Sequence, residues 1–365
     1  MNYSIFISQN VPNSDIKKYK VSQAANNFCL HINNLQYFSH HIAVPPANVD
    51  GTFVNHTDNE LNIEYHLCRK IKHSGIGKKT NTILDNLWIY KRVIKAKEQN
   101  VWFYNVWTGN LLAYFLVLLL STKNVYILLA DYNPSRYNNV VGKILLWAIS
   151  KAKGVISLSA RCKEVNKEFC SIPGIIPEKK IRKTMGPCIG KNKFLLSGTL
   201  NENTGLFLAL DVFKNLPGAK LYLSGILSED CKKKVEDICS KYNNIEYKGF
   251  FEKYSDYLDF IQGVDITLSL RNPDSPVNHY NFPSKILETL AYNKVVLSTI
   301  EYPELDGVNY LFAPYNKDCL KLYIQEIITG RKDSEIERCL DNSDILTERY
   351  SEKAWIEAFK KMESK

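Results

Sequence analysis

The sequence predicts an α/β protein made of two tandem, doubly wound (Rossmann-like) domains. From Lys193 onward, short apolar runs alternate with amphipathic helical stretches. This alternation is typical of β-α-β units that form a parallel sheet covered by helices on both faces. The first half shows the same alternation less regularly. A chain of 365 residues, of which 45% are hydrophobic, is long enough to bury two such cores.

The expected elements can be placed in chain order. In the first half, strands are expected at 3–8, 101–106, 124–131 and 154–159, with helical stretches between them. In the second half, we expect strands at 193–198, 219–225, 245–250, 265–271 and 294–299, and helices at 205–216, 228–242, 253–263 and 284–292.

Two further helices are expected outside this alternation. The apolar run Leu111–Leu120 is roughly half as long as a membrane-spanning helix, so it predicts a buried core helix. The last residues, 351–365, predict an amphipathic docking helix with Trp355, Ile356 and Phe359 on one side.

Glycine and proline residues within 171–192 interrupt any long element, so the linker is expected there. This gives an N-terminal domain at 1–187, a second domain at 188–345 and a final helical segment at 346–365.

The net charge of +9 is concentrated in the first half of the chain. Between Arg69 and Lys97, nine Lys or Arg residues stand against the single acid Asp85, and between Lys151 and Lys193 eleven stand against three acids. Such clusters are either solvated helix faces or a surface attracted to anionic lipid headgroups or to a phosphate-linked acceptor. No recognisable nucleic-acid-binding module accompanies them, so no nucleic-acid partner is expected.

The cysteines and histidines show no spacing that indicates a metal site. Nine cysteines are scattered without a C-x-x-C pair, which is typical of a reduced, cytoplasmic protein. The opening MNYSIFISQN is too short and too polar for a secretory signal, so it is expected to form a first strand.

The segment HYNFPSKILETLAYNKVVLST, 279–299, predicts a phosphate site. It places Ser284 and Lys285 in the first turn of a helix that follows a strand and a loop, where unpaired N–H groups and the helix dipole favour an anion. Glu288 lies one turn further along, where its carboxylate can accept hydrogen bonds from the vicinal hydroxyls of a ribose. The alternative is a local Lys285–Glu288 surface pair that contributes a few tenths of a kcal/mol. The face of this helix expected against the sheet comprises Ile286, Leu287, Leu290 and Ala291.

Other candidate positions also follow predicted strands, where ligands bind in doubly wound sheets. In the loop SGTLNENTG, 197–205, Gly198 would let a ligand approach the backbone and Gly205 opens the next helix, although turn formation explains both glycines equally well. Asp131, Asn105 and Asn10 follow strands of the first half and are candidates for contacting the acceptor or the donor sugar; a turn or capping role is the alternative. The sequence shows no recognisable pair of nucleophile and base.

At this point the chain resembles a known family. RNPDSPVNHYNFPSKILETLAYNKVVLSTIEYPEL, 271–305, is similar to the nucleotide-sugar segment of group 1 (family 4-like) GT-B glycosyltransferases, in the bacterial polysaccharide-assembly branch that carries a YSFPSK-x-x-EY-x-x-x-G-x-PV type of motif. FLLSGTLNENTG lies upstream, where that family has its G-x-L-x-x-x-x-G loop. The resemblance covers roughly Phe194 to Phe312.

The resemblance implies a GT-B architecture, with a cleft between two Rossmann-like domains and a last helix that crosses back to the N-terminal domain. It also implies a retaining, metal-independent glycosyltransferase of the hexosyltransferase type. Such an enzyme moves a sugar from a nucleoside-diphosphate donor to a glycan or lipid-linked acceptor in surface polysaccharide (capsule) biosynthesis. The donor is a substrate, and no cofactor is expected.

The resemblance also assigns candidate residues. Glu288 matches the second glutamate of the family's paired-glutamate motif, which holds the donor ribose, while the first glutamate falls on Tyr280. The two loop cations fall on Thr199 and Thr204, so three charged groups of the family pattern are missing. The expected donor-binding set is Gly198, Thr199, Leu200, Gly249, Phe250, Arg271, Asn281, Phe282, Pro283, Ser284, Lys285 and Glu288.

These departures leave three possibilities open. Lys285 and Arg271 supply the missing positive charge, the protein binds its donor weakly, or it no longer catalyses transfer. If it is active, Asp131 and Lys285 are the catalytic candidates, with Asn10 and Asn105 on the acceptor side. A backbone contact around 248–251 would hold the base, so the donor can be a UDP- or a GDP-sugar.

We therefore expect a cytoplasmic glycosyltransferase at the inner face of the cell membrane, with a peripheral contact between its basic N-terminal half and anionic lipid. The alternatives are a non-catalytic GT-B partner subunit of a glycan-assembly complex, and a nucleotide-sugar epimerase or hydrolase.

Overall fold

The computed structural model describes residues 4–19, 21–45, 52–68, 75–133, 138–177, 190–251 and 253–365. The chain divides into two compact units. Unit 1 comprises Met1–Ile175 and Glu352–Lys365, and unit 2 comprises Ile176–Ser351. The chain thus passes into unit 2 before the expected boundary between 187 and 188, which lies outside the described residues. It returns to unit 1 six residues after the expected boundary between 345 and 346.

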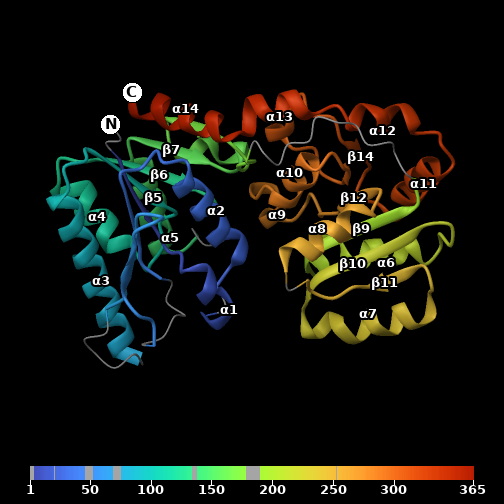
Figure 1. Cartoon of the computed structure of the whole chain (residues 1–365), viewed down its shortest axis with the longest axis horizontal. Coiled ribbons are helices and arrows are strands. Elements are labelled where there is room, and N and C mark those ends of the chain that lie inside the picture. The colour runs from blue at the N-terminus through green and yellow to red at the C-terminus, as the bar shows by residue number, and fades with distance from the viewer. Residues whose placement is uncertain are drawn as a thin grey trace. The chain divides into compact units, whose positions relative to one another are not determined.

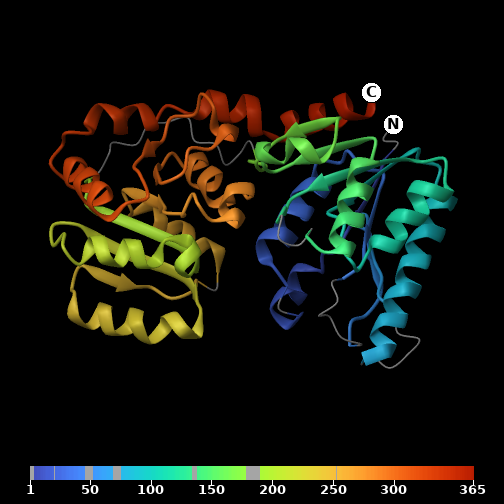
Figure 2. The same cartoon turned by 180° about the vertical axis from the view of Figure 1, so that it is seen from behind.

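Unit 1 is built on an eight-stranded sheet with the order β3-β4-β2-β1-β5-β6-β7-β8, in which the β3–β4 pair is antiparallel. Figure 1 labels its strands β5, β6 and β7, and Figure 2 shows the same unit from behind. Its strands are β1 (Ser4–Ser8), β2 (His40–Ala43), β3 (His56–Asp58), β4 (Ile63–Tyr65), β5 (Asn100–Tyr104), β6 (Asn124–Leu129), β7 (Gly154–Ser157) and β8 (Phe169–Ser171). Its helices are α1 (Ile16–Tyr19), α2 (Gln23–Asn34), α3 (Gly75–Lys95), α4 (Leu111–Leu120), α5 (Val140–Ser150) and α14 (Glu352–Glu363). Adjacent central strands β1 and β5 connect to opposite halves of the sheet, so the switch point lies between them.

Unit 2 is built on a six-stranded parallel sheet with the order β11-β10-β9-β12-β13-β14. Its strands are β9 (Lys193–Leu200), β10 (Lys220–Leu227), β11 (Ile245–Tyr247), β12 (Ile266–Ser269), β13 (Val295–Ser298) and β14 (Leu311–Phe312). Its helices are α6 (Leu206–Phe213), α7 (Glu229–Lys241), α8 (Tyr254–Gln262), α9 (Pro276–Tyr280), α10 (Ser284–Ala291), α11 (Lys317–Ile328), α12 (Asp333–Cys339) and α13 (Ser343–Tyr350). In chain order these strands read 3-2-1-4-5-6, the doubly wound order, with the switch point between β9 and β12.

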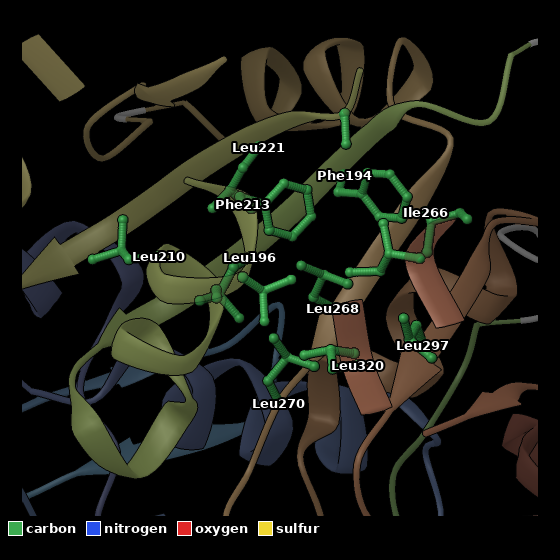
Figure 3. Packing of buried hydrophobic residues seen from close by; sticks show 14 of the residues in the cluster. Phe194, Leu196, Leu210, Phe213, Leu221, Ile266, Leu268, Leu270, Leu297 and Leu320 are labelled. Carbon is green, nitrogen blue, oxygen red and sulfur yellow. The ribbon is translucent and has the colours of Figure 1, made fainter. Parts of the chain in front are cut away.

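The largest apolar cluster of unit 2 lies on one face of this sheet, against α6 and α11. Figure 3 shows Phe194 and Phe213 side by side, with Ile266, Leu268 and Leu320 continuing the same apolar layer. The ring centroids of Phe194 and Phe213 are 5.2 Å apart in an edge-to-face arrangement. Leu195 of β9 belongs to a second buried cluster, with Tyr257, Ile261 and Val264. Because successive residues of a strand face opposite sides, apolar side chains on both faces produce the continuous runs from which the strands were predicted.

The prediction that Leu111–Leu120 forms a buried core helix is wrong. The run is helical, as α4, but only Ala113, Tyr114 and Val117 are buried. Leu119 and Leu120 are 61% and 65% exposed. An all-apolar run has no polar face to mark its outer side, so its pattern could not show which residues face solvent.

Helix α14 completes unit 1 from the far end of the chain and lies beside β7 (Figure 1). Trp355 is fully buried and donates a hydrogen bond from Nε1 to the Gly174 carbonyl oxygen, at 2.8 Å. Its ring centroid lies 5.6 Å from that of Phe28 of α2. Near the other end of α14, the Glu363 carboxylate accepts hydrogen bonds from Ser4, Tyr37 and Trp102. Trp355 and Phe359 of the stripe predicted in 351–365 therefore belong to the core of unit 1, whereas Ile356 is only half-buried.

Replacing Trp355 with alanine is expected to lower the free energy of unfolding of unit 1 by about 3–5 kcal/mol, because it leaves a cavity and an unpaired Gly174 carbonyl. Trp147→Ala is the control: Trp147 is 47% exposed, so its loss should cost less than about 1 kcal/mol. Urea unfolding followed by far-UV circular dichroism measures both. Equal losses would show that α14 does not stabilise unit 1.

Candidate functional site

The candidate site of unit 2 lies at the carboxyl ends of β9 and β12, the switch point of the sheet. Leu200 ends β9, and its side chain is buried in the core, so only its backbone is available to a ligand. Gly198 has a φ of 118°, and an added Cβ there would meet no atom within 4 Å. Thr199 is exposed beside it. The end of β9 therefore presents open backbone, as the sequence suggested for Gly198.

Glycines also lie near the carboxyl ends of the next two strands of the sheet, β10 and β11. Gly225 of β10 is in register with Gly198, and an added Cβ there would lie 1.8 Å from the Gly198 carbonyl oxygen. Gly225 in turn donates its N–H to the Gly249 carbonyl oxygen, at 2.9 Å. An added Cβ at Gly249 would meet open space, and Phe250 beside it is half exposed. Because Gly198, Gly225 and Gly249 have no side chains, none of them covers the backbone at this edge of the sheet, from β9 to β11.

Gly205 holds the loop after β9 against the end of β12. Its φ is 78°, and an added Cβ would lie 1.7 Å from the Leu270 carbonyl oxygen. The preceding turn is closed by Asn201 and Thr204, which exchange side-chain and backbone hydrogen bonds of 3.0 and 3.2 Å. Thr204 thus stabilises the loop. Gly205 forms the turn before α6, the alternative considered for it, and its close approach to β12 was not predicted.

Arg271 follows β12 and is half-buried at the switch point. Its Nη1 donates to Asn278 Oδ1 at 3.3 Å, and burial lowers the pKa of its guanidinium, which nevertheless stays charged at neutral pH. Among the described residues, no carboxylate forms an ion pair with Arg271. A partly buried cation without an acidic partner is a suitable contact for a ligand anion.

Sequence reasoning missed Asn278, which connects the two loops at the switch point. It is 2% exposed, and its Nδ2 donates to the carbonyl oxygens of Asn203 and Asn272, at 2.9 and 3.1 Å. Because its Oδ1 also accepts from Arg271, this one amide fixes the guanidinium relative to both loops. The only sequence signal was its position in a long polar loop.

The second group of the site surrounds the beginning of α10. Lys285 Nζ donates to Glu288 Oε2 at 2.7 Å and lies 4.5 Å from the ring centroid of Tyr257. The pKa of Lys285 is raised, because Glu288 and Tyr257 together outweigh the lowering effect of burial. Tyr257 OH lies 3.2 Å from Ser197 Oγ, at the end of β9. Tyr257 and Ser197 were not predicted, and they connect Lys285 to the strand ends.

The Lys285–Glu288 ion pair, which was the alternative to a phosphate and ribose site, is therefore formed in this structure. The apolar face of α10 is buried as expected, at Ile286, Leu287, Leu290 and Ala291. Ser284 is exposed at the first turn of α10, and Pro283 at the N-cap position provides no side-chain hydrogen bond to this turn.

The side chains of the preceding segment connect elements of the fold. Asn281 donates to the Val277 carbonyl oxygen at 2.9 Å, and Phe282 packs edge-to-face on Tyr302, with ring centroids 5.1 Å apart. Pro283 is buried. Tyr280, at the position of the family's first glutamate, packs edge-to-face on His279.

The candidates of unit 1 also lie at a switch point. Asn10 and Asn105 follow the adjacent central strands β1 and β5, and both are buried. Asn105 Oδ1 accepts hydrogen bonds from the N–H groups of Ala130 and Asp131, at 2.8 and 3.3 Å. Asn105 thus has the turn role that was weighed for it, and it positions Asp131, whose side chain is exposed.

A serine and a histidine that the sequence did not mark as a pair lie within hydrogen-bond distance at the end of β1. Ser8 Oγ lies 2.7 Å from His41 Nε2, and His41 Nδ1 lies 3.1 Å from Asn33 Oδ1. However, Ser8 and His41 are 1% and 0% exposed, and burial lowers the pKa of His41 to about 3. A substrate cannot reach this serine, so the chain of hydrogen bonds stabilises the end of β1.

No cluster of three or more His, Cys, Asp or Glu residues suited to a metal ion occurs in the part of the chain that the structure describes. The eight cysteines of that part are all free.

No family model and no curated protein matches the sequence. Solved structures match along the whole chain. HepE from Anabaena, in a complex with UDP and glucose, matches with a TM-score of 0.69 and 12% identity, over 100% of both chains. A glycosyltransferase from Rickettsia africae matches with a TM-score of 0.68 and 12% identity, over 99% of this chain and 97% of that one. Sucrose-phosphate synthase from Thermosynechococcus elongatus matches with a TM-score of 0.69 and 11% identity, over 99% and 98%.

At such low identities the likeness shows the fold. The protein has the fold of the GT-B glycosyltransferases, with two Rossmann-like units, as the sequence predicted.

Gly205→Ala is expected to destabilise unit 2 by about 2–5 kcal/mol, because the methyl group would collide with the Leu270 carbonyl and the positive φ would be strained. Gly218→Ala is the matched control, since an added Cβ there meets no atom within 4 Å. It should change stability by less than about 1 kcal/mol. Thermal unfolding measures both. Equal stability of the two variants would contradict the contact between the β9 loop and β12.

Proposed function

We propose that the protein is a retaining, metal-independent glycosyltransferase. It moves a sugar from a nucleoside-diphosphate donor to a glycan or lipid-linked acceptor in surface polysaccharide biosynthesis. The fold and the family resemblance of 271–305 support the transferase class, and unit 2 is the donor-binding unit in this proposal.

The observation that carries the proposal is Arg271 at the switch point of unit 2. Its guanidinium is partly buried, held by Asn278, and has no ion-pair partner among the described residues. A diphosphate needs a fixed cation at this place, because charge develops on it as the sugar leaves. Arg271 therefore replaces the loop cations that the family carries at the positions of Thr199 and Thr204.

The group around α10 supplies the remaining donor contacts. Lys285 reaches the diphosphate together with the exposed N–H groups and hydroxyl at Ser284, and Glu288 turns to the ribose hydroxyls when Lys285 leaves it for the phosphate. The open backbone at Gly198 and Gly249 lets the donor approach the sheet, and the half-exposed ring of Phe250 offers a surface for the base.

Little side-chain chemistry is needed for the transfer itself. Cations and helix N–H groups stabilise the leaving diphosphate, and an oxygen of the donor phosphate accepts the proton of the attacking hydroxyl on the same face of the sugar. Asp131 of unit 1 is assigned to orient the acceptor or donor sugar, because Asn105 fixes its backbone while its carboxylate stays exposed. Asn10 belongs to the same end of that sheet.

A lipid-linked acceptor places the reaction at a membrane, and we assign the protein to the cytoplasmic side. Among the described residues, the helices are too short or too polar to cross a bilayer. In this proposal the basic unit 1 makes a peripheral contact with the membrane.

A second candidate is a GT-B partner subunit without catalytic activity. The Lys285–Glu288 ion pair favours it, since each group already satisfies the other without a ligand. The missing charges at Tyr280, Thr199 and Thr204 favour it as well. A partner subunit would bind no nucleotide, whereas a nucleotide-sugar epimerase or hydrolase would bind and convert the donor in the absence of any acceptor.

Thermal-shift titration with UDP, GDP, UMP, GMP and their sugar conjugates tests the donor site. One diphosphate is expected to stabilise the protein more than its monophosphate. Arg271→Gln should weaken diphosphate binding about 10–100-fold, the effect of losing a hydrogen bond to a charged group. Arg331→Gln, at an exposed arginine of unit 2, should leave binding unchanged. Absence of any response in the unmodified protein would favour the partner subunit.

Glu288→Ala is expected to weaken nucleotide binding by about 1–3 kcal/mol, because the ribose hydroxyls lose a charged acceptor. Lys285→Ala should weaken binding of the diphosphate more than that of the nucleoside. Isothermal titration with nucleoside, monophosphate and diphosphate separates the two effects. If nucleotide affinity is unchanged in both variants, Lys285 and Glu288 form only a surface ion pair and do not contact the donor.

A further inference from the structure

Helix α3 has an inverted pattern of polarity. Its buried face carries the polar residues Asn81, Asp85 and Asn86, alongside Ile89 and Val93. Its outer side carries exposed large apolar residues at helical spacing: Ile76, Ile83, Leu87 and Ile94. A helix of a soluble domain normally places apolar residues inward, so this outer stripe has no role in the core.

The next two helices of unit 1 repeat this feature. α4 exposes Leu112, Leu119 and Leu120, and α5 exposes Val140, Val141, Ile144 and Trp147. Three helices in succession therefore turn branched or aromatic side chains to solvent. Single exposed apolar residues are ordinary, but a contiguous group of them indicates an interaction surface.

Helices α3 and α4 pack against each other, and α5 lies beside α4 (Figure 2). Tyr90 of α3 donates from its hydroxyl to the carbonyl oxygen of Leu120, at 3.3 Å. Phe115 of α4 stacks on Trp147 of α5, with ring centroids 5.9 Å apart. Tyr114 OH also donates to the Ala148 carbonyl oxygen, at 2.7 Å. We call the outer side of α3, α4 and α5 the α3–α5 face.

The charges on the α3–α5 face have one sign. Exposed lysines stand between the apolar residues at Lys79, Lys91, Lys95 and Lys143, and Lys151 follows α5 directly. The only acid in the three helices is Asp85, which is 4% exposed and accepts a hydrogen bond from the Cys68 N–H. The face is thus apolar and basic, with no exposed carboxylate on its helices.

We infer that the α3–α5 face docks on the surface of a bilayer that contains anionic lipids. Apolar side chains enter the boundary of the acyl chains while lysines remain at the level of negatively charged headgroups. Trp147, with Lys151 Nζ 6.0 Å from its ring centroid, forms the amphipathic pair that favours this boundary. This inference deepens the membrane part of the proposed function and does not depend on the donor site.

A second copy of the chain fits the same surface less well. A two-fold contact through the α3–α5 face would place lysines of one copy against lysines of the other, with no carboxylate on these helices to neutralise them. A bilayer with anionic headgroups supplies the opposite charge and also accepts the apolar stripe.

Vesicle flotation of the full chain tests the inference. The probes are vesicles of phosphatidylcholine alone and vesicles that also contain phosphatidylglycerol, each at low and high salt. We expect the protein to float with the anionic vesicles at low salt, and to float less as salt screens the lysines. Binding to both lipid compositions with equal strength would overturn the role of charge.

Matched variants test the surface itself. The double variant Lys79→Glu, Lys91→Glu should weaken partitioning into anionic vesicles at least about 25-fold, which is about fivefold for each lysine removed. The control double variant Lys232→Glu, Lys233→Glu on α7 should not change the partitioning. Leu120→Gln should weaken it several-fold, and Leu322→Gln, at a residue of α11 that is 56% exposed, should not. Equal effects of surface variants and controls would overturn the assignment to the α3–α5 face.

Light scattering without vesicles measures the oligomeric state, and so tests whether a second copy of the chain binds the α3–α5 face instead. A dimer that dissociates on Leu120→Gln, in a protein that floats with no vesicles, would overturn the membrane assignment in favour of a second copy. The nucleotide thermal shift of the same preparation reports on the donor site separately, so failure of one proposal can be told apart from failure of the other.

Discussion

The contact between the backbone of Gly205 and the carbonyl of Leu270 is the constraint on which the candidate site of unit 2 depends. It brings the loop after β9 against the end of β12, two strands that are neighbours only because the sheet changes direction there. Asn278 then has both loops within hydrogen-bond reach and fixes Arg271 between them. A backbone approach too close for any side chain thus sets the position of a charged side chain, which is how a parallel sheet builds a polar site above an apolar core.

Most of the fold of unit 2 could be predicted from the sequence. Its strands are buried on both faces and its helices on one face, so each kind of element has a recognisable pattern of apolar residues. The alternation from Lys193 onward gave β9, β10, β12 and β13 to within a few residues, and the spacing of Ile286, Leu287, Leu290 and Ala291 gave the buried face of α10. Short strands such as β2 and β14 were not predicted. β2 contains two histidines, and β14 has only two residues, so neither has an apolar run to mark it.

The candidate site was predicted where a motif marked it, at Arg271, Lys285 and Glu288. Tyr257, Ser197 and Asn278 act through tertiary contacts, and no local pattern in the sequence records such contacts.

Burial decides the role of several polar groups whose geometry alone would mislead. Ser8, His41 and Asn33 have the spacing of a catalytic triad, but they are enclosed, and His41 stays neutral because the interior disfavours its charge. Lys285 and Glu288 have the opposite situation. They are partly exposed, they pair with each other, and water and ions can reach them, so their pairing is weak enough to be exchanged for a ligand. Arg271 lies between these extremes, since it is buried enough to be fixed, and no acid among the described residues forms an ion pair with it.

The return of the chain to unit 1 through α14 affects how the protein is made. The hydroxyl of Tyr37 and the indole N–H of Trp102 find their acceptor on Glu363, a residue synthesised after the whole of unit 2. During translation, unit 1 therefore leaves the ribosome with part of its apolar surface uncovered, and it stays so until residues 352–363 emerge. Unit 2, which is continuous in sequence, can complete its core first. The first half of the chain is thus expected to be the part that depends on chaperones, although it is synthesised earlier.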